Sequence, residues 1–172
     1  TGHGVAAALD SSTVKIAFRN ERQEFASPAR LLSNMNQFLK PLVDYRFVSA
    51  QYAYFDLDAM VLSLGSAGHP PLILLRENAA EFLESDGLLL GVDYEAAFAA
   101  REVKLKTGDR LVFYTDGLSE TDAGFDRDRD ALRDLALACQ NLSPPRFMDE
   151  AVRWLEQRRA AVGDDVTVIV VD

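Results

Sequence analysis

Apolar positions in the first forty residues recur at steps of three and four, which is the spacing of one face of a helix. A first helix is predicted from residue 4 to about residue 19, with one face made by Val5, Ala8, Leu9, Ser12 and Ile16. A second helix is predicted to begin at Pro28, behind an N-cap at Ser27. Its apolar positions are Leu31, Met35, Phe38, Leu39 and Leu42. Pro41 is expected to perturb the end of this second helix.

Short β-rich runs follow between residues 47 and 115, separated by Gly, Pro, Asn and Asp, as is typical of a meander of antiparallel strands. The strands are predicted at residues 47–55, 60–64, 72–75, 98–105 and 110–115. The letters KTGD at residues 106–109 are expected to make the turn between the last two strands.

Two further helices and a final strand complete the pattern. The helices are predicted at residues 131–140 and from residue 146 to about 161, the second behind a cap at Ser143. The charged run DAGFDRDRDAL before them alternates in sign, which favours a solvated loop. The β-branched run VTVIVV at residues 166–171 predicts a buried strand that returns to the sheet. Helices, strands, helices and a returning strand together predict an α+β layered architecture.

Composition and charge narrow the class of protein. A chain of 172 residues that is 48% hydrophobic is long enough for one globular domain, and no apolar run approaches the roughly 18 to 20 residues that cross a bilayer. The net charge of -9 argues against a nucleic-acid-binding surface. The single cysteine, Cys139, excludes an internal disulfide and suits a reducing cytoplasm. We therefore expect a cytoplasmic enzyme or interaction domain with no membrane or nucleic-acid partner.

Two aspartate motifs carry the candidate chemistry. Asp116 ends a predicted strand in VFYTDGLSE, while Asp164 and Asp165 precede another in GDDVTVIVV. Each motif alone is typical of an ordinary turn or strand start. If the two strands pair antiparallel, however, the carboxylates share one edge of the sheet and repel each other unless a cation or a shared proton relieves them. Oxygen ligands of this kind favour Mg²⁺ or Mn²⁺ over Zn²⁺.

A phosphorylated substrate would fit such a metal site. A protein of net charge -9 repels phosphate unless bound metal ions invert the local field. Two ions about 3.5 to 4 Å apart can polarise phosphoryl oxygens and activate a water near neutral pH. The predicted reaction is therefore phosphoester hydrolysis.

Other nucleophiles and bases compete poorly with this interpretation. His3, in the turn TGHG, could donate to a substrate or leaving group, although a hydrogen bond within the turn is favoured. His69 precedes two prolines and is expected to brace a loop, and Cys139 lies on an apolar helix face where core packing is expected. The segment LSLGSAGH lacks the GxSxG pattern, and no GK[ST] follows the glycines to make a phosphate-binding loop.

An ordered series of motifs resembles the bacterial SpoIIE-like, RsbU-type branch of the metal-dependent protein phosphatases, which is similar to protein phosphatase 2C. The series is GHGVAAAL, FVSAQYAYFD, AGHPPLILLR, GLLLG, GDRLVFYTDGLSE and DDVTVIVV, and it covers nearly the whole chain. The resemblance implies a four-layer α-β-β-α sandwich with two Mn²⁺ or Mg²⁺ ions at one end of the sheets. It also implies hydrolysis of phosphoserine or phosphothreonine by a metal-activated water.

The resemblance assigns roles residue by residue. Asp116 and Asp164 are expected to be the catalytic metal ligands. Gly2, His3, Gly117 and Asp165 are expected to support those ligands or to contact the substrate. The implied substrates are phosphorylated proteins of the anti-anti-sigma type, and the implied parent chain carries a sensor or receiver domain upstream.

The first motif departs from the family pattern. In the family it is D-x-x-G-H-G, with metal ligands from the aspartate and from the carbonyl of the next residue, and Thr1 stands two positions after that aspartate. We therefore expect residues 1–172 to be a single phosphatase domain without its N-terminal strands, whose unpaired sheet edge favours a homodimer. The alternative is a non-catalytic phosphatase-like module that binds a regulatory partner.

Overall fold

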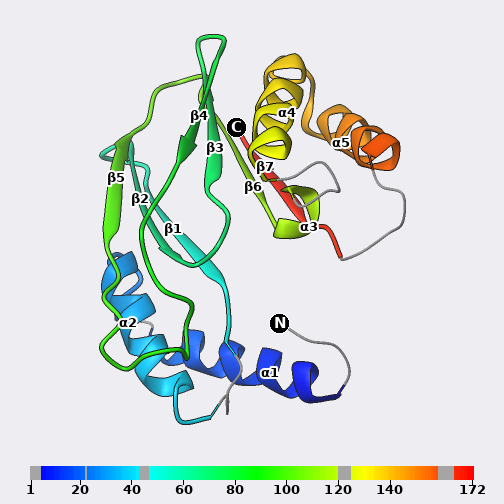
Figure 1. Ribbon diagram of the computed structural model, residues 1–172. Helices are drawn as coiled ribbons and strands as arrows, with labels where there is room; N and C mark the ends of the chain where they lie inside the picture. Colours follow the sequence, from blue (N-terminus) through cyan, green and yellow to red (C-terminus); the bar gives the residue numbers. More distant parts are fainter. Residues whose placement is uncertain (1–4, 22, 43–46, 120–124, 159–164) are drawn as a thin grey trace. The chain divides into compact units, whose positions relative to one another are not determined.

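The computed structural model describes residues 5–21, 23–42, 47–119, 125–158 and 165–172. The chain divides into two compact units, of which the first comprises Thr1–His69 and Glu84–Leu105. The second comprises Pro70–Leu83 and Lys106–Asp172 (Figure 1). Each unit has its own sheet and its own helices, so each is described by itself.

The first unit contains two helices and a three-stranded antiparallel sheet in the order β1-β2-β5. The helices are α1 (Val5–Asn20) and α2 (Pro28–Leu39). The strands are β1 (Ala50–Asp56), β2 (Val61–Ala67) and β5 (Ala100–Lys104). Tyr52 pairs with Gly65 across β1 and β2, and Leu64 pairs with Arg101 across β2 and β5.

Helix α1 forms as predicted, but its buried face is not the predicted one. Leu9 and Ile16 are 64% and 54% exposed, whereas Ala17 is fully buried and Val14 packs beside it. The face of α1 that packs on the core therefore carries Val14 and Ala17, and it differs from the face that carries Leu9 and Ile16. A small side chain at the contact allows two helices to approach closely, because the distance between their axes depends on the residues between them.

Helix α2 follows the sequence pattern closely. It begins at Pro28 behind Ser27 and ends at Leu39, two residues before Pro41. Its buried side chains form the core of the first unit with Ala67 and Leu90; the helix contributes Leu31, Leu32, Met35 and Leu39. Phe38 and Leu42, which the spacing also placed on the apolar face, are exposed.

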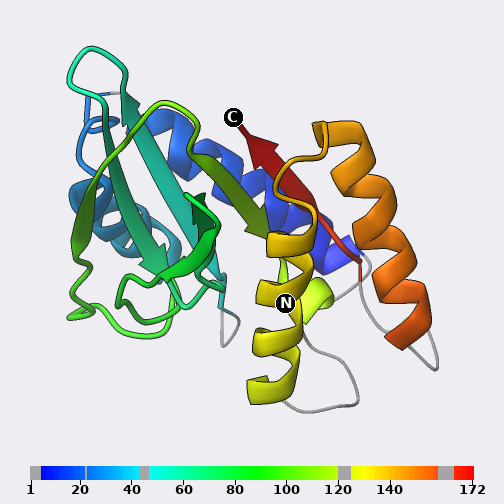
Figure 2. The same ribbon diagram turned by 90° about the horizontal axis from the view of Figure 1, so that it is seen from above.

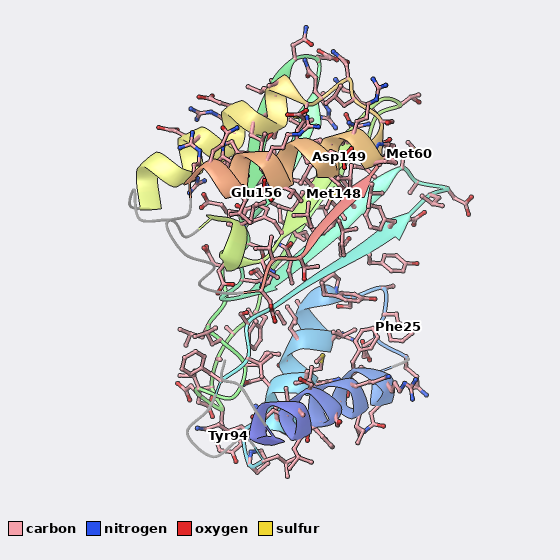
Figure 3. All side chains as sticks on the ribbon, turned by 90° about the vertical axis from the view of Figure 1, so that its right-hand side faces the viewer. Phe25, Met60, Tyr94, Met148, Asp149 and Glu156 are labelled. Atoms are coloured by element: carbon pink, nitrogen blue, oxygen red, sulfur yellow. The ribbon has the colours of Figure 1, made fainter. Side chains whose placement is uncertain are left out.

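An aromatic group joins the connection between α1 and α2 to the sheet. Phe25, which is labelled in Figure 3, stacks on Phe18 with ring centroids 5.5 Å apart. The hydroxyl of Tyr52 on β1 donates a hydrogen bond of 3.0 Å to the carbonyl of Phe25. Burial raises the pKa of this Tyr52 hydroxyl above its ordinary value, and the nearby Tyr54 adds to the effect.

The second unit contains a four-stranded antiparallel sheet in the order β4-β3-β6-β7. Its strands are β3 (Leu72–Arg76), β4 (Ala79–Leu83), β6 (Arg110–Tyr114) and β7 (Val168–Val171). Its helices are α3 (Asp116–Ser119), α4 (Phe125–Ala138) and α5 (Pro144–Arg158). Helices α4 and α5 lie side by side (Figure 2) and share a core with one face of the sheet, through side chains that include Ile73, Val112, Leu132 and Phe147.

Three elements of this unit differ from the sequence prediction. Strand β4 was not predicted; it forms because Glu77 and Asn78 adopt positive φ angles of 49° and 64°, which make a tight hairpin between Arg76 and Ala79. The short helix α3 was also not predicted. The prediction that the charged run DAGFDRDRDAL forms a loop is wrong from residue 125 onward, because α4 begins there.

Two ion pairs tie β6 to its surroundings. Asp109, in the predicted KTGD turn, accepts a hydrogen bond of 2.8 Å from the Lys106 amide and two from the Arg76 guanidinium, at 2.8 and 2.6 Å. Arg110 pairs with Asp172 beyond the end of β7 and donates a 2.7 Å hydrogen bond to the Leu142 carbonyl, just after α4. These contacts fix β6 at its N-terminal end, opposite to the end that carries Asp116.

Candidate metal site at the ends of β6 and β7

The pairing of β6 with β7 carries the candidate site. The two strands are antiparallel, which is the condition on which the sequence analysis placed the aspartate motifs at one edge, with Tyr114 opposite Val168. Beyond that pair, the Thr115 amide donates a 3.0 Å hydrogen bond to the Thr167 carbonyl. The end of β6 therefore lies beside the start of β7 (Figure 1), where the two aspartate motifs meet.

Asp116 and Asp165 lie on this shared edge, and both are exposed. Asp116 begins α3, and its Oδ1 accepts a 2.9 Å hydrogen bond from the Gly117 amide. A Cβ added at Gly117 would lie only 2.4 Å from the Asp165 carbonyl oxygen. The backbone that carries Asp165 thus passes directly against the residue after Asp116, and only a glycine permits that approach.

The chemistry of these side chains suits a hard divalent cation. Both are carboxylates on one sheet edge, and oxygen donors are the ligands that Mg²⁺ and Mn²⁺ prefer. Among the residues that the structure describes, no group of three or more His, Cys, Asp or Glu side chains is placed to hold a metal ion. The described residues place the Asp165 backbone against Gly117, directly after Asp116, and the carboxylates of Asp116 and Asp165 fit the predicted metal in donor chemistry.

Several predicted site residues lie outside the described ranges. Gly2, His3 and Asp164 belong to residues 1–4 and 159–164, so their predicted roles stay predictions. Of the remaining site residues, the structure brings Asp116, Gly117 and Asp165 together.

The residue that sequence reasoning missed is Thr115. Its hydroxyl accepts a 2.9 Å hydrogen bond from the Thr167 amide and lies 3.5 Å from the Asp165 carbonyl oxygen, to which it donates. The register signals this pair, because Tyr114 opposite Val168 places Thr115 opposite Thr167. That register depends on contacts distant in sequence, so the motif TDG alone does not reveal it.

His69 and Cys139 occupy the structural roles predicted for them. The amide of His69 donates to the Ser66 hydroxyl at 3.3 Å, and its ring Nδ1 lies 3.3 Å from the Ser49 hydroxyl oxygen, which supports a bracing role in its loop. Cys139 is buried in the core of the second unit, and burial raises the pKa of its thiol above the ordinary value. A thiol in such surroundings is unreactive because the thiolate is disfavoured.

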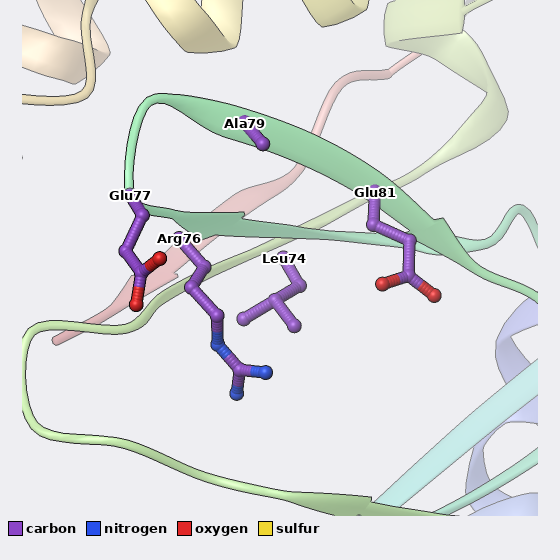
Figure 4. A pocket seen from close by; sticks show the side chains of 5 residues that line it. All are labelled: Leu74, Arg76, Glu77, Ala79 and Glu81. Carbon is purple, nitrogen blue, oxygen red and sulfur yellow. The ribbon is translucent and has the colours of Figure 1, made fainter.

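A hollow on the β3–β4 hairpin of the second unit also bears charged groups. It has a volume of about 230 Å³, and Figure 4 shows its lining residues, Leu74, Arg76, Glu77, Ala79 and Glu81. The Arg76 guanidinium on this hollow already pairs with Asp109, whose side chain is only 6% exposed. The Arg76 hydrogen bonds hold the pKa of the Asp109 carboxyl below its usual value. Arg76 thus supports the turn before β6.

Among the described residues, no helix has the length and apolar character that crossing a membrane requires.

Comparison with known proteins identifies the family. The family model described as Stage II sporulation protein E (SpoIIE) matches residues 1–172. The chain is 31% identical to the phosphoserine phosphatase RsbU of Bacillus subtilis over 129 residues, which are 72% of this chain and 38% of that protein.

Solved structures agree with this match. The RsbU and RsbW domains of a Mycobacterium tuberculosis protein match with a TM-score of 0.83 at 27% identity, over 99% of this chain and 48% of that one. The manganese-presoaked phosphatase domain of SpoIIE from Bacillus subtilis matches with a TM-score of 0.64 at 15% identity, over 99% of this chain and 74% of that one. These likenesses confirm the predicted α+β sandwich fold class. The chain spans less than half the length of RsbU and of the Mycobacterium tuberculosis chain. It belongs to the SpoIIE family.

Proposed function

We propose that this chain provides a metal-dependent phosphatase site that hydrolyses phosphoserine or phosphothreonine on a protein partner. The observation that carries the proposal is the antiparallel pairing of β6 with β7, which brings the Asp116 and Asp165 motifs to one edge of the sheet. Membership of the SpoIIE family supports the same activity, since the relative RsbU is named a phosphoserine phosphatase.

The proposed roles follow the chemistry of each group. Asp116 and Asp164 bind the metal, which is Mn²⁺ or Mg²⁺ and is present as two ions. When bound, such ions stabilise the charge on the phosphoryl oxygens and activate the attacking water. Asp165 supports the ligands from the start of β7, and Gly117 allows its backbone to approach Asp116. Gly2 and His3 contact the ligands or the phosphorylated substrate.

The proposed partner is a phosphorylated regulator of the anti-anti-sigma type. Its support is the family, together with the solved neighbour in which RsbU and RsbW domains occur together. We further propose a cytoplasmic location, a sensor or receiver domain upstream and a homodimer.

Two substitutions in the full-length protein test the metal site. Asp116→Asn and Asp164→Asn each remove one negative oxygen ligand, so Mn²⁺-dependent release of phosphate from a phosphorylated anti-anti-sigma protein should fall by more than about 100-fold. The melting temperatures of both variants in EDTA should not fall below that of the wild type, because removing one carboxylate relieves its repulsion with the other carboxylates. The matched control is Asp149→Asn, an exposed aspartate on α5 that is labelled in Figure 3, and it should keep full activity.

The outcomes separate the two candidate functions. Activity within a few-fold of wild type in both site variants contradicts the metal-ligand assignment. Absence of Mn²⁺-dependent turnover in the wild-type protein, with binding to the phosphorylated partner intact, favours the non-catalytic module instead.

A further inference from the structure

We infer that Thr115 is a positioning residue for the proposed metal site: its hydroxyl sets the distance between Asp116 and the chain that carries Asp165. The inference rests on the proposed function and adds to it a side chain that need not touch metal or substrate.

Thr115 stands at the corner where strand β6 turns into helix α3. Its carbonyl accepts a 2.9 Å hydrogen bond from the Leu118 amide in the first turn of α3. In a regular antiparallel ladder, that carbonyl would instead accept the hydrogen bond of the residue opposite. The turn into α3 therefore diverts the backbone acceptor that the amide of Thr167 would otherwise use.

The Thr115 hydroxyl takes the place of the diverted carbonyl. It accepts the 2.9 Å hydrogen bond from the Thr167 amide, while the Thr115 amide donates to the Thr167 carbonyl at 3.0 Å. The same oxygen donates toward the Asp165 carbonyl at 3.5 Å. One side chain thus continues the strand pairing past the last backbone pair, up to the residue that bears the second carboxylate.

This arrangement links the positions of both carboxylates. Asp116 follows Thr115 directly, and its direction is set by the turn that the Thr115 carbonyl begins. Asp165 lies two residues before Thr167, whose amide the Thr115 hydroxyl holds. Losing the hydroxyl removes the hydrogen bonds to the Thr167 amide and the Asp165 carbonyl, and leaves only the bond from the Thr115 amide to the Thr167 carbonyl. It removes no carboxylate, and groups that orient metal ligands typically change metal affinity 10- to 100-fold.

Variants of the full-length protein test this role by metal affinity and amide exchange, which need no phosphatase assay, and by turnover. Thr115→Val keeps the shape and removes the acceptor, so the Kd for Mn²⁺, measured from the electron paramagnetic resonance of free Mn²⁺, should rise by about 10-fold or more. Thr115→Ser keeps a hydroxyl and should remain within about threefold of wild type. In metal-free protein the Thr167 amide should exchange with solvent faster in the valine variant than in wild type. At saturating Mn²⁺, turnover of the valine variant should return toward wild type, because the hydroxyl is not among the reacting groups.

Controls make each outcome decisive. Thr13→Val removes a hydroxyl that bonds the Leu9 carbonyl on α1 at 3.0 Å, and it should leave the Kd unchanged. Thr115→Ala gives the same comparison if the valine variant does not fold. A Kd within twofold of wild type in the hydroxyl-free variant overturns the role of Thr115. Failure of the wild-type protein to bind Mn²⁺ overturns the proposed function itself.

Discussion

Replacing Gly117 with alanine should separate Asp116 from the start of β7. The added Cβ would lie 2.4 Å from the Asp165 carbonyl oxygen, 3.2 Å from the Asp165 carbonyl carbon and 3.3 Å from Val166 Cγ2. Ordinary contact begins at 3.4 Å, so the backbone at Asp165 must move by about 1 Å. The obstacle is backbone, which cannot rotate out of the way as a flexible side chain can.

The displacement has two expected costs. Overpacking of this kind typically lowers the free energy of unfolding by about 1–3 kcal/mol. A shift of about 1 Å in reacting or positioning groups can cost roughly 100-fold in rate. For Gly117→Ala we therefore expect a lower melting temperature in EDTA and a Mn²⁺ requirement raised at least 10-fold, because the displaced backbone would move the ligands proposed at Asp116 and Asp164 apart.

The assay compares this variant with a second glycine substitution. Gly108 lies in the KTGD turn with a φ of 91° and no atom within 4 Å of an added Cβ. Gly108→Ala should cost about 1 kcal/mol through backbone strain and leave the Mn²⁺ requirement unchanged. A Gly117→Ala variant with wild-type stability and wild-type Mn²⁺ dependence would refute the close approach of Asp165 to α3.

Two further predictions concern the support of each unit. Asp109→Asn should lower the free energy of unfolding by about 1.5–3 kcal/mol, because it breaks hydrogen bonds from Arg76 to a charged, nearly buried acceptor. Since the folded pKa of Asp109 is below its unfolded value, its stabilisation is present above about pH 4 and is lost as the pH falls through the folded pKa. Urea unfolding between pH 2 and 6 should show that loss in wild type and not in the variant, and identical pH profiles would contradict it. Asn36→Leu should cost about 1–3 kcal/mol, because the fully buried Asn36 side chain accepts from the Gly91 amide at 2.8 Å and donates to the Asp93 carbonyl at 2.7 Å. An unchanged urea midpoint for Asn36→Leu would show that these two hydrogen bonds, from α2 to Gly91 and Asp93, do not stabilise the first unit.

The sequence predicted the ends of helix α2 and the KTGD turn, because residues close together in the sequence determine them. Helix α2 begins at Pro28 and ends before Pro41 because proline favours a first helical turn and disrupts later ones. The KTGD turn forms where Asp109 can accept from the Lys106 amide. The candidate site was predicted on the condition that β6 and β7 pair antiparallel, and the structure shows that pairing.

Features that depend on distant contacts were not predictable in this way. The residue pattern alone predicted one meander, and only the resemblance implied two sheets. The strands divide into sheets of three and four strands, which long-range pairing determines. Strand β4 depends on left-handed backbone at Glu77 and Asn78, where no glycine signals a turn. The buried face of α1 follows Val14 and Ala17 because its partner is α2, not because of its own apolar spacing.

The candidate site shows the same division. The two aspartate motifs and their preference for Mg²⁺ or Mn²⁺ were predicted from the residues, and the resemblance to a family selected Asp116 and Asp164 as the ligands. The place of Thr115 follows only from the way α3 occupies its carbonyl and leaves its hydroxyl to hold Thr167.

Paramagnetic broadening by Mn²⁺ tests the central claim most directly. Because Mn²⁺ relaxes nearby nuclei, trace amounts added to the ¹⁵N-labelled full-length protein should first broaden two amide signals. They are those of Gly117, directly after Asp116, and of Thr167, two residues after Asp165. Asp116→Asn should abolish that selective broadening. If those two amides keep their intensity while signals elsewhere disappear, the metal binds at another place and the account of the β6–β7 edge is wrong.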